Sequence, residues 1–215
     1  VKELFVQLKR VEVLNQRKIG GWSNDEIAQL AEDECRRTGS CLVIVNTKAS
    51  ALALYQHSKA QSDIPALHLS TSMCPVHRKR LLRVIRHRLK WGKPVLCFST
   101  QLIEAGVDVD FGAVIRFTAG LDSIAQAAGR CNRHGRRETG IVHVVNPADE
   151  KLERLEDIKV GRDKAERVLD EYENDPARFG NDCIGPEAMR WYFKNYFFDR
   201  ADEMTYPLAA GETGR

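Results

Sequence analysis

No run of about 18 uncharged apolar residues, the length that predicts a membrane-spanning helix, occurs in this sequence. The chain begins Val-Lys-Glu, with neither an initiating Met nor a signal peptide. We therefore expect a cytoplasmic protein with no membrane partner, and the missing Met indicates a segment excised from a longer chain. The six cysteines include no C-x-x-C pair, so reduced, buried thiols are expected in place of zinc ligands or disulfides.

Acidic residues are absent from one long block. Between Ile64 and Ile103 there is no Asp or Glu, although the formal net charge of the whole chain is only +3. Such a block makes a local positive field that can attract phosphate backbones. Lys79, Arg83 and Arg86 share one face of a predicted helix and are the candidate nucleic-acid contacts within the block. The alternative is a solvated basic face opposite a buried leucine stripe.

Short apolar runs alternate with helical patterns up to residue 147. Strands are expected within 5–14 and at 41–45, 66–69, 95–98, 113–117 and 141–145. Helices are expected at 24–37, 48–59, 75–90 and 122–133. This alternation predicts an α/β domain with a parallel sheet and right-handed crossovers.

Composition changes after this domain, which we place at residues 1–147. Residues 148–207 are expected to form a helical extension, with a charge-dense helix at 149–173 and an aromatic helix from Pro186. The tail, 208–215, is expected to be loose. At 215 residues, with 43% hydrophobic and 29% charged residues, the chain can bury one sizeable core.

Two polar segments flank the strand expected at 113–117. The first reads Thr100-x3-Glu104-x-Gly106-Val107-Asp108. The second reads Gln126-x2-Gly129-Arg130-x2-Arg133, a spacing that places one amide and two guanidiniums on a single helix face. Forked guanidinium donors suit polyphosphate, so the pattern predicts a phosphate site and no metal site.

These segments resemble motif V and motif VI of superfamily 2 helicases. The resemblance is closest to the second RecA-like lobe of type I CRISPR-associated helicase-nucleases, with a type I-C-like subtype expected. It is carried by STQLIEAGVDVDF followed by QAAGRCNRHG and covers roughly residues 40–207. Ala127 departs from the pattern, since many superfamily 2 members carry Arg there.

The resemblance implies a three-layer RecA-like domain that binds ATP and magnesium only when paired with a first lobe. Arg130 and Arg133 would act as arginine fingers in a catalytic set with Gln126. Gly106, Asp108 and Gly129 would lie near the nucleotide. The residues implied to hold single-stranded DNA are Thr100 and Glu104, with Asn46 and Thr47 as a short match to motif IV.

Several sequence features of that family are missing. No G-x4-G-K-[ST] loop occurs, none of the Asp-Glu pairs is followed by x-His, and there is no His-Asp dipeptide. These residues alone are therefore predicted to have no ATPase activity and to lack the family's nuclease domain. The resemblance further implies, as partners, the first lobe, the nuclease domain and a CRISPR RNA-guided surveillance complex. The family's substrate is the single strand displaced by guide pairing, and its role is antiviral defence.

Each assignment has an alternative. Arg130 and Arg133 could be solvated cations at a helix end, where they complement the helix dipole. Thr100 and Asp108 could brace a turn, and Asn46 is as readily structural as functional. At the level of the whole chain, a lobe of a non-CRISPR superfamily 2 RNA or DNA helicase and a catalytically inert nucleic-acid-binding module both remain open.

Overall fold

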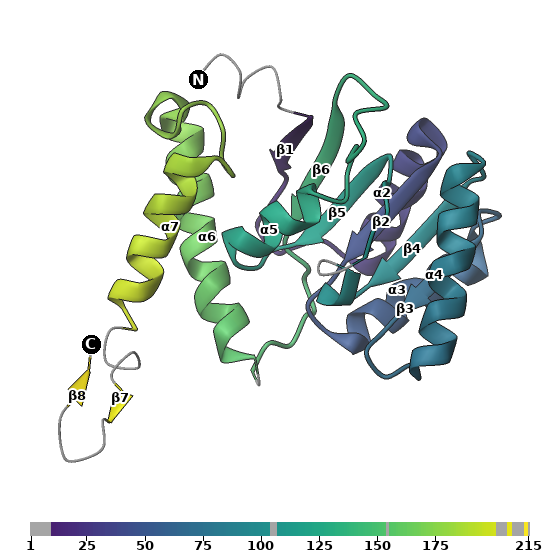
Figure 1. The fold of residues 1–215 in the computed structure, drawn as a ribbon, viewed down its shortest axis with the longest axis horizontal. Coiled ribbons are helices and arrows are strands. Elements are labelled where there is room, and N and C mark those ends of the chain that lie inside the picture. The colour runs from purple at the N-terminus through teal and green to yellow at the C-terminus, as the bar shows by residue number, and fades with distance from the viewer. Residues whose placement is uncertain (1–9, 104–106, 154, 201–205, 208–212, 215) are drawn as a thin grey trace.

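The computed structural model describes residues 10–103, 107–153, 155–200, 206–207 and 213–214. Six strands form the central sheet: β1 Val11–Asn15, β2 Ser40–Ile44, β3 Ala66–Leu69, β4 Val95–Ser99, β5 Ala113–Phe117 and β6 Gly140–Val145. Their order is β1-β6-β5-β2-β4-β3, and all neighbours pair in parallel (Figure 1). The predicted parallel α/β sheet is confirmed.

The central strands are short and apolar because helices cover both of their faces. Every residue of β2, β4 and β5 is buried, as expected for strands inside a parallel sheet. Three buried polar side chains lie in these runs: Ser40 in β2, Ser99 in β4 and Arg116 in β5. Ser99 and Arg116 take part in the candidate site described below.

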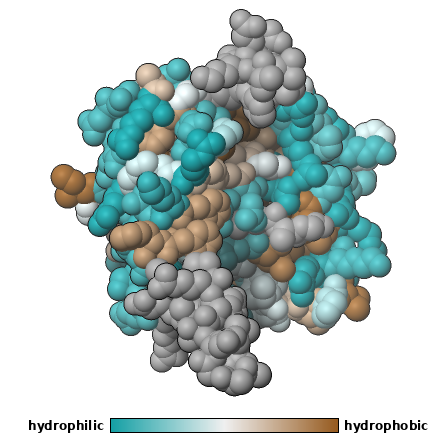
Figure 2. Space-filling model, turned by 60° about the vertical axis from the view of Figure 1, so that its left-hand side comes forward, coloured by the Kyte–Doolittle hydropathy of each residue, from teal (hydrophilic) through white to brown (hydrophobic). Residues whose placement is uncertain are grey.

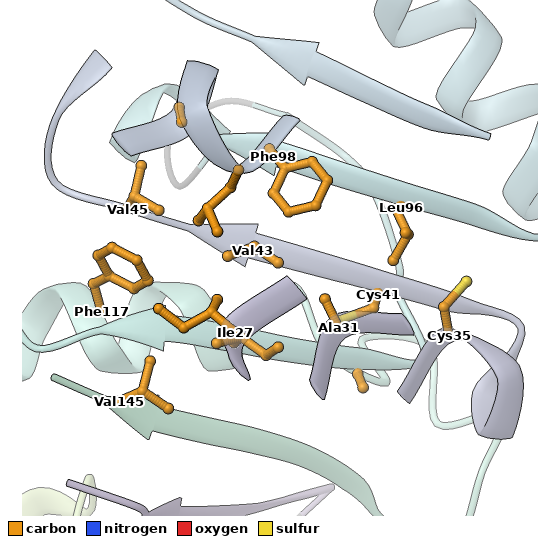
Figure 3. Packing of buried hydrophobic residues seen from close by; sticks show 14 of the residues in the cluster. Ile27, Ala31, Cys35, Cys41, Val43, Val45, Leu96, Phe98, Phe117 and Val145 are labelled. Atoms are coloured by element: carbon orange, nitrogen blue, oxygen red, sulfur yellow. The ribbon is translucent and has the colours of Figure 1, made fainter. Parts of the chain in front are cut away.

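Helices α2 Asn24–Thr38 and α3 Lys48–Gln61 cover one face of the sheet. Ser23 and Glu26 form a capping box at the start of α2, and Gly39 ends it with φ of 83°. Figure 3 shows side chains of α2 packed against Val43, Phe117 and Val145, which come from three different strands.

The opposite face is covered by α4 Pro75–Lys90 and α5 Leu121–Ala128. Proline at the first position starts α4, as predicted. Between β4 and β5, a short 3-10 helix spans Gln101–Ile103. The helix expected at 122–133 is shorter than predicted, because it ends at Ala128.

The extension consists of α6 Glu156–Asn174, a 3-10 turn at Pro176–Phe179 and α7 Pro186–Phe198. Leu121 and Ile124 of α5 share a hydrophobic cluster with Val168 of α6 and Tyr192 of α7. The prediction of a helical C-terminal extension is confirmed by α6 and α7, although α6 begins at Glu156. The domain boundary at 147 stays a prediction. Residues Tyr206–Pro207 and Thr213–Gly214 pair as a small antiparallel ribbon, β7 and β8.

Part of α7 faces solvent. Phe193, Phe197 and Phe198 are 37%, 45% and 80% exposed, whereas Tyr192 is buried. Figure 2, which turns the α6–α7 side of Figure 1 forward, shows a light-brown hydrophobic patch within a mostly hydrophilic surface. None of the described helices combines the length and apolarity that a membrane span requires.

Candidate functional site

The two predicted guanidiniums lie just beyond α5, in residues 129–135, called the arginine turn below. After Ala128 the chain runs alongside the residues that precede β5. Phe111 N donates to Arg130 O at 2.9 Å, and Asn132 N donates to Phe111 O at 3.0 Å. This short parallel bridge takes the place of further helical bonds. The prediction of one continuous helix face through Arg133 is therefore wrong.

Asn132 organises the arginine turn, and its role was not predicted. It is fully buried and has a left-handed φ of 46°, a conformation that Asn tolerates better than most residues. Its Nδ2 donates to the carbonyl oxygens of Arg10 and Arg137 at 3.0 and 2.8 Å, and its Oδ1 accepts from Arg137 N at 3.0 Å. The available signal was an Asn three residues before Gly135, a pair typical of a tight turn.

Arg130 and Arg133 have different environments. Arg130 is 9% exposed, and its Nε donates to Ile103 O at 2.9 Å. The Arg133 side chain is 42% exposed, and its Nε lies 3.3 Å from Oδ1 of Asp108. The motif V and motif VI segments thus lie side by side, as the resemblance implies. Arg133 is the more accessible of the two predicted fingers.

Asp110 also binds the arginine turn. Its Oδ1 accepts from Arg133 N at 2.7 Å, and its Oδ2 accepts from His134 N at 3.3 Å and lies 3.0 Å from His134 Nδ1. The Asp110 side chain is only 7% exposed. The sequence motif drew attention to Asp108 alone, although Asp110 is the second acid of the same Asp-Val-Asp run.

The other predicted nucleotide-side residues are placed as follows. Gln126 is exposed on α5, and Gly129 is the exposed residue at the C-terminal end of that helix. A Cβ at Gly129 would meet nothing closer than Gln126 O at 3.3 Å. Close packing of helix on sheet therefore does not explain this glycine. Gly106 and Glu104 lie outside the described residues.

Thr100 follows β4 at the carboxyl edge of the sheet, meaning the edge where the parallel strands end. It is 8% exposed, and its Oγ1 is buried with no hydrogen-bond partner in the described part of the chain. Its neighbour Ser99 is fully buried, and the Ser99 Oγ donates to Thr100 O at 2.9 Å. A buried hydroxyl without a partner is costly, so Thr100 Oγ1 is a candidate contact for an incoming group.

Asn46 and Thr47 follow β2 at the same edge, but Glu150 binds both. Glu150 Oε1 accepts from the backbone N atoms of Asn46 and Thr47 at 3.0 and 3.1 Å. The Asn46 Nδ2 donates to Glu150 Oε2 at 2.8 Å and to Thr118 O at 2.9 Å. The Thr47 hydroxyl caps α3 through Ser50 N. Both residues predicted to contact single-stranded DNA therefore have hydrogen-bond partners within the chain.

Arg116 completes this buried network. It is fully buried in β5, and its Nη1 donates to Asn46 Oδ1 at 2.7 Å and to Phe117 O at 3.0 Å. Burial raises the pKa of the Glu150 carboxyl, while the hydrogen bonds from Asn46 and the Arg116 charge act in the opposite direction. Neither Arg116 nor Glu150 was predicted, because each gains its role only when distant segments meet.

On α4, the predicted contacts Lys79, Arg83 and Arg86 are all exposed. Ile85 is fully buried on the inner face of the same helix, as the leucine stripe predicts. Arg86 additionally donates from Nε to Asp108 O at 3.1 Å. Helix α4, called the basic helix below, therefore contacts Asp108, the residue whose side chain lies beside Arg133.

The site residues divide between two edges of the sheet. Thr100, Asn46 and Thr47 follow strands. The arginine turn instead contacts Arg10, Asp110 and Arg137, which precede β1, β5 and β6 at the amino edge. The described residues contain no group of three or more His, Cys, Asp or Glu side chains able to hold a metal ion.

A family comparison explains this arrangement. Residues 37–136 match the family model described as CRISPR-associated nuclease/helicase Cas3, C-terminal. Together with the relatives and solved structures reported below, this match supports a C-terminal RecA-like lobe of a Cas3 helicase. The matched residues include β2 to β5 and the whole arginine turn.

Curated relatives share parts of the lobe. The Cas3 nuclease/helicase of Haloferax volcanii is 43% identical over 74 residues, 34% of this chain and 8% of its own length. That of Methanothermobacter thermautotrophicus is 27% identical over 154 residues, 70% of this chain and 18% of its own length. The lobe thus spans less than a fifth of either relative.

Solved structures share the fold. The T. fusca Cas3-ADP structure aligns with a TM-score of 0.66 and 16% identity, covering 91% of this chain and 26% of that one. The helicase MrfA, in a structure bound to DNA and AMPPNP, aligns with a TM-score of 0.54 and 15% identity, covering 92% of this chain and 27% of that one. These alignments show that the chain shares the RecA-like fold of the two structures.

Proposed function

We propose that this Cas3 lobe is half of an ATP-dependent motor that moves along single-stranded DNA in CRISPR interference. The observation that carries the proposal is the half-exposed Arg133 guanidinium, which lies beside Asp108 where the motif V and motif VI segments meet. A planar, forked donor that water can reach suits a phosphate group. The first lobe of the parent protein would hold ATP and its magnesium ion. Closure of the cleft between the two lobes would bring the phosphates to Arg133.

In the closed enzyme, Arg130 and Arg133 would both act on the γ-phosphate. Arg133 can leave the exposed Asp108 carboxylate for a phosphate oxygen. The Nε of Arg130 holds Ile103 O, so this side chain would also keep the segment after β4 in place. Gln126, Gly129 and Gly106 would line the same side of the cleft. These fingers act chiefly in the transition state, when charge develops on the transferred group.

The DNA backbone would run along the carboxyl edge and across α4. Thr100 offers a buried hydroxyl with no partner among the described residues, which a phosphate oxygen could satisfy. Lys79, Arg83 and Arg86 would supply positive charge on α4, and Glu104 would lie near the strand. Asn46 and Thr47 could join only by leaving Glu150. Opening and closing of the cleft during ATP turnover would move the strand.

The test compares the isolated chain with the full-length parent protein, with magnesium and single-stranded DNA present. We expect DNA-stimulated phosphate release from the parent and none from the isolated chain, because these residues include no phosphate-cradling loop. The Arg133→Ala variant of the parent serves as the control for contaminating ATPases. Steady release by the isolated chain that Arg133→Ala abolishes would overturn the two-lobe proposal. Equal rates of phosphate release by the parent with and without DNA would overturn the proposal of a DNA-dependent motor.

A further inference from the structure

We infer that Asp110 is a positioning residue for ATP hydrolysis: it fixes the backbone of Arg133 and thereby sets where that guanidinium can reach. The inference rests on the proposed function, in which Arg133 meets a phosphate. Asp110 itself would touch neither nucleotide nor nucleic acid. It would act only through the arginine turn.

The hydrogen bonds of Asp110 hold the backbone of Arg133 and His134, an arrangement called the clamp below. An ionised carboxylate only accepts hydrogen bonds, and here its oxygens face three nitrogens of two consecutive residues. The shortest contact, 2.7 Å, is to Arg133 N, which is bonded to the Cα that bears the Arg133 side chain. His134 N and Nδ1 lie at 3.3 and 3.0 Å from the other oxygen.

The clamp is attached to the sheet. Asp110 directly precedes Phe111, whose backbone pairs with Arg130 and Asn132, and β5 begins shortly afterwards. On the other side, Arg10 Nη1 donates to Arg133 O at 2.7 Å. The peptide groups on both sides of the Arg133 Cα are therefore bound, while its side chain keeps a half-exposed position.

Asp108 and Asp110 have separate tasks. The Asp108 side chain is 68% exposed and contacts the Arg133 side chain, so a phosphate can replace it. The Asp110 side chain is 7% exposed and contacts main-chain nitrogen, so no ligand replaces it. Catalytic rates depend steeply on such placement, since a 1 Å displacement of a reacting group can reduce the rate about 100-fold.

The first experiment measures ATP turnover, KM for ATP and single-stranded DNA affinity on full-length parent variants. Asp110→Ala should lower kcat about 100-fold, with KM and DNA affinity within about twofold of the parent. Asp110→Asn keeps an acceptor for Arg133 N and should stay within about fivefold of parental kcat. Asp110→Glu keeps the charge but lengthens the side chain, so it should lose as much as Asp110→Ala.

The matched control is Asp182→Ala, which removes a carboxylate that accepts from Ile184 N at 3.2 Å in a turn of the extension. It should leave kcat at the parental value. If Asp182→Ala lowered kcat as much as Asp110→Ala, the loss would be a general effect of loosening a turn, and the inference would be overturned.

The second experiment combines Asp110→Ala with Arg133→Ala. If Asp110 acts through Arg133, the double variant should turn over ATP no more slowly than Arg133→Ala alone. Multiplied losses would overturn the inference. A slow Arg133→Ala beside a parental Asp110→Ala would overturn it while leaving the proposed function intact. A parental rate for Arg133→Ala would overturn both. If Asp110→Ala does not fold, Asp110→Asn and Asp110→Glu test the inference in its place. Parental ATP turnover by both of these variants would overturn the inference.

Discussion

The Oδ1 atom of Asp108 lies 3.3 Å from Nε of Arg133, although β5 and α5 separate the two residues in the chain. The carbonyl oxygen of Asp108 accepts a hydrogen bond from Arg86 of the basic helix. One residue therefore contacts both the helix proposed to bind DNA and the side chain proposed to meet ATP. A DNA phosphate that attracts Arg86 would remove the hydrogen bond from Arg86 to Asp108. Binding of DNA could in this way affect the residue beside Arg133, the side chain proposed to meet ATP.

The two arginines should respond differently to truncation. In the full-length parent, Arg133→Ala should reduce ATP turnover about 10³-fold or more while ATP affinity stays close to parental. Arg130→Ala should reduce turnover and also lower the free energy of unfolding by about 2 kcal/mol, because the buried Ile103 carbonyl loses its charged donor. Steady-state kinetics, nucleotide binding and denaturant unfolding on the same samples measure these effects.

Lysine variants control for charge alone. Arg133→Lys keeps one positive charge but not the planar two-donor fork, so we expect poor recovery of turnover. Full recovery would show that any cation suffices there. If both alanine variants hydrolysed ATP at the parental rate with DNA present, the two residues would be solvated turn residues and not fingers.

Thr100→Val should weaken DNA binding without weakening the fold. The Thr100 hydroxyl is buried and has no partner in the described structure, so the isosteric apolar side chain should leave stability equal or raise it by about 1 kcal/mol. Single-stranded DNA affinity should fall, because the group proposed to meet the backbone is gone. Thermal unfolding and fluorescence anisotropy measure the two effects.

Ser99→Ala is the matched control, since the Ser99 hydroxyl is also buried but donates to Thr100 O. It should lower stability by about 1 kcal/mol. A Thr100→Val protein that loses stability yet binds DNA like the parent would make Thr100 a structural residue and would contradict the proposed contact.

Local patterns predicted the sheet well. Apolar runs such as 66–69 and 113–117 are strands with the predicted bounds, because a short apolar run between helical patterns is typical of a strand in a parallel sheet. The arginine turn was mispredicted, since nothing local reveals that Phe111 pairs with Arg130 and Asn132. Tertiary hydrogen bonds ended that helix, and helical spacing cannot show such competition.

The site followed the same rule. Arg133 and Asp108 were proposed because each belongs to a short motif, and the structure brings their side chains together. Asp110 and Glu150 were missed because their partners lie far away in sequence. Asn46 shows the converse, since a motif-like position turned out to be bound to Glu150 and Arg116. Which polar residues are bound within the chain became visible only from their partners in three dimensions.

Glu150→Ala should destabilise the lobe. Glu150 accepts from the backbone nitrogens of Asn46 and Thr47 and from the Asn46 amide, and these donors would lose their partner. We expect the free energy of unfolding to fall by about 2 kcal/mol. Asp149→Ala, a change at the exposed preceding residue, should have an effect below about 0.5 kcal/mol. Equal stability of the two variants in urea unfolding would show that the Glu150 contacts contribute nothing.

The cysteines should give one fast-reacting thiol per chain. Five of the six are buried, and only Cys74 is exposed. Burial raises the pKa of both the Cys97 and Cys131 thiols to about 12, so near pH 8 they stay protonated and unreactive. Brief alkylation followed by peptide mapping should label Cys74 alone, and Cys74→Ser should abolish the fast phase. Rapid labelling of Cys97 in the native protein would contradict the packing of β4.

The basic helix supplies the last prediction. Lys79 and Arg83 are exposed on α4, within a block of the sequence that contains no acidic residue. If α4 follows the DNA backbone, Lys79→Glu with Arg83→Glu should flatten the slope of log affinity against log salt for single-stranded DNA by about 1.4, since each lost phosphate contact removes roughly 0.7. The matched control reverses two exposed cations on other helices, Lys59→Glu on α3 and Arg167→Glu on α6, which changes the net charge equally. Equal slopes for the two double variants would mean that only total charge matters, and α4 would then be a solvated face. A flatter slope for the α4 variant alone would place phosphates along Lys79 and Arg83, next to the Arg86 contact with Asp108.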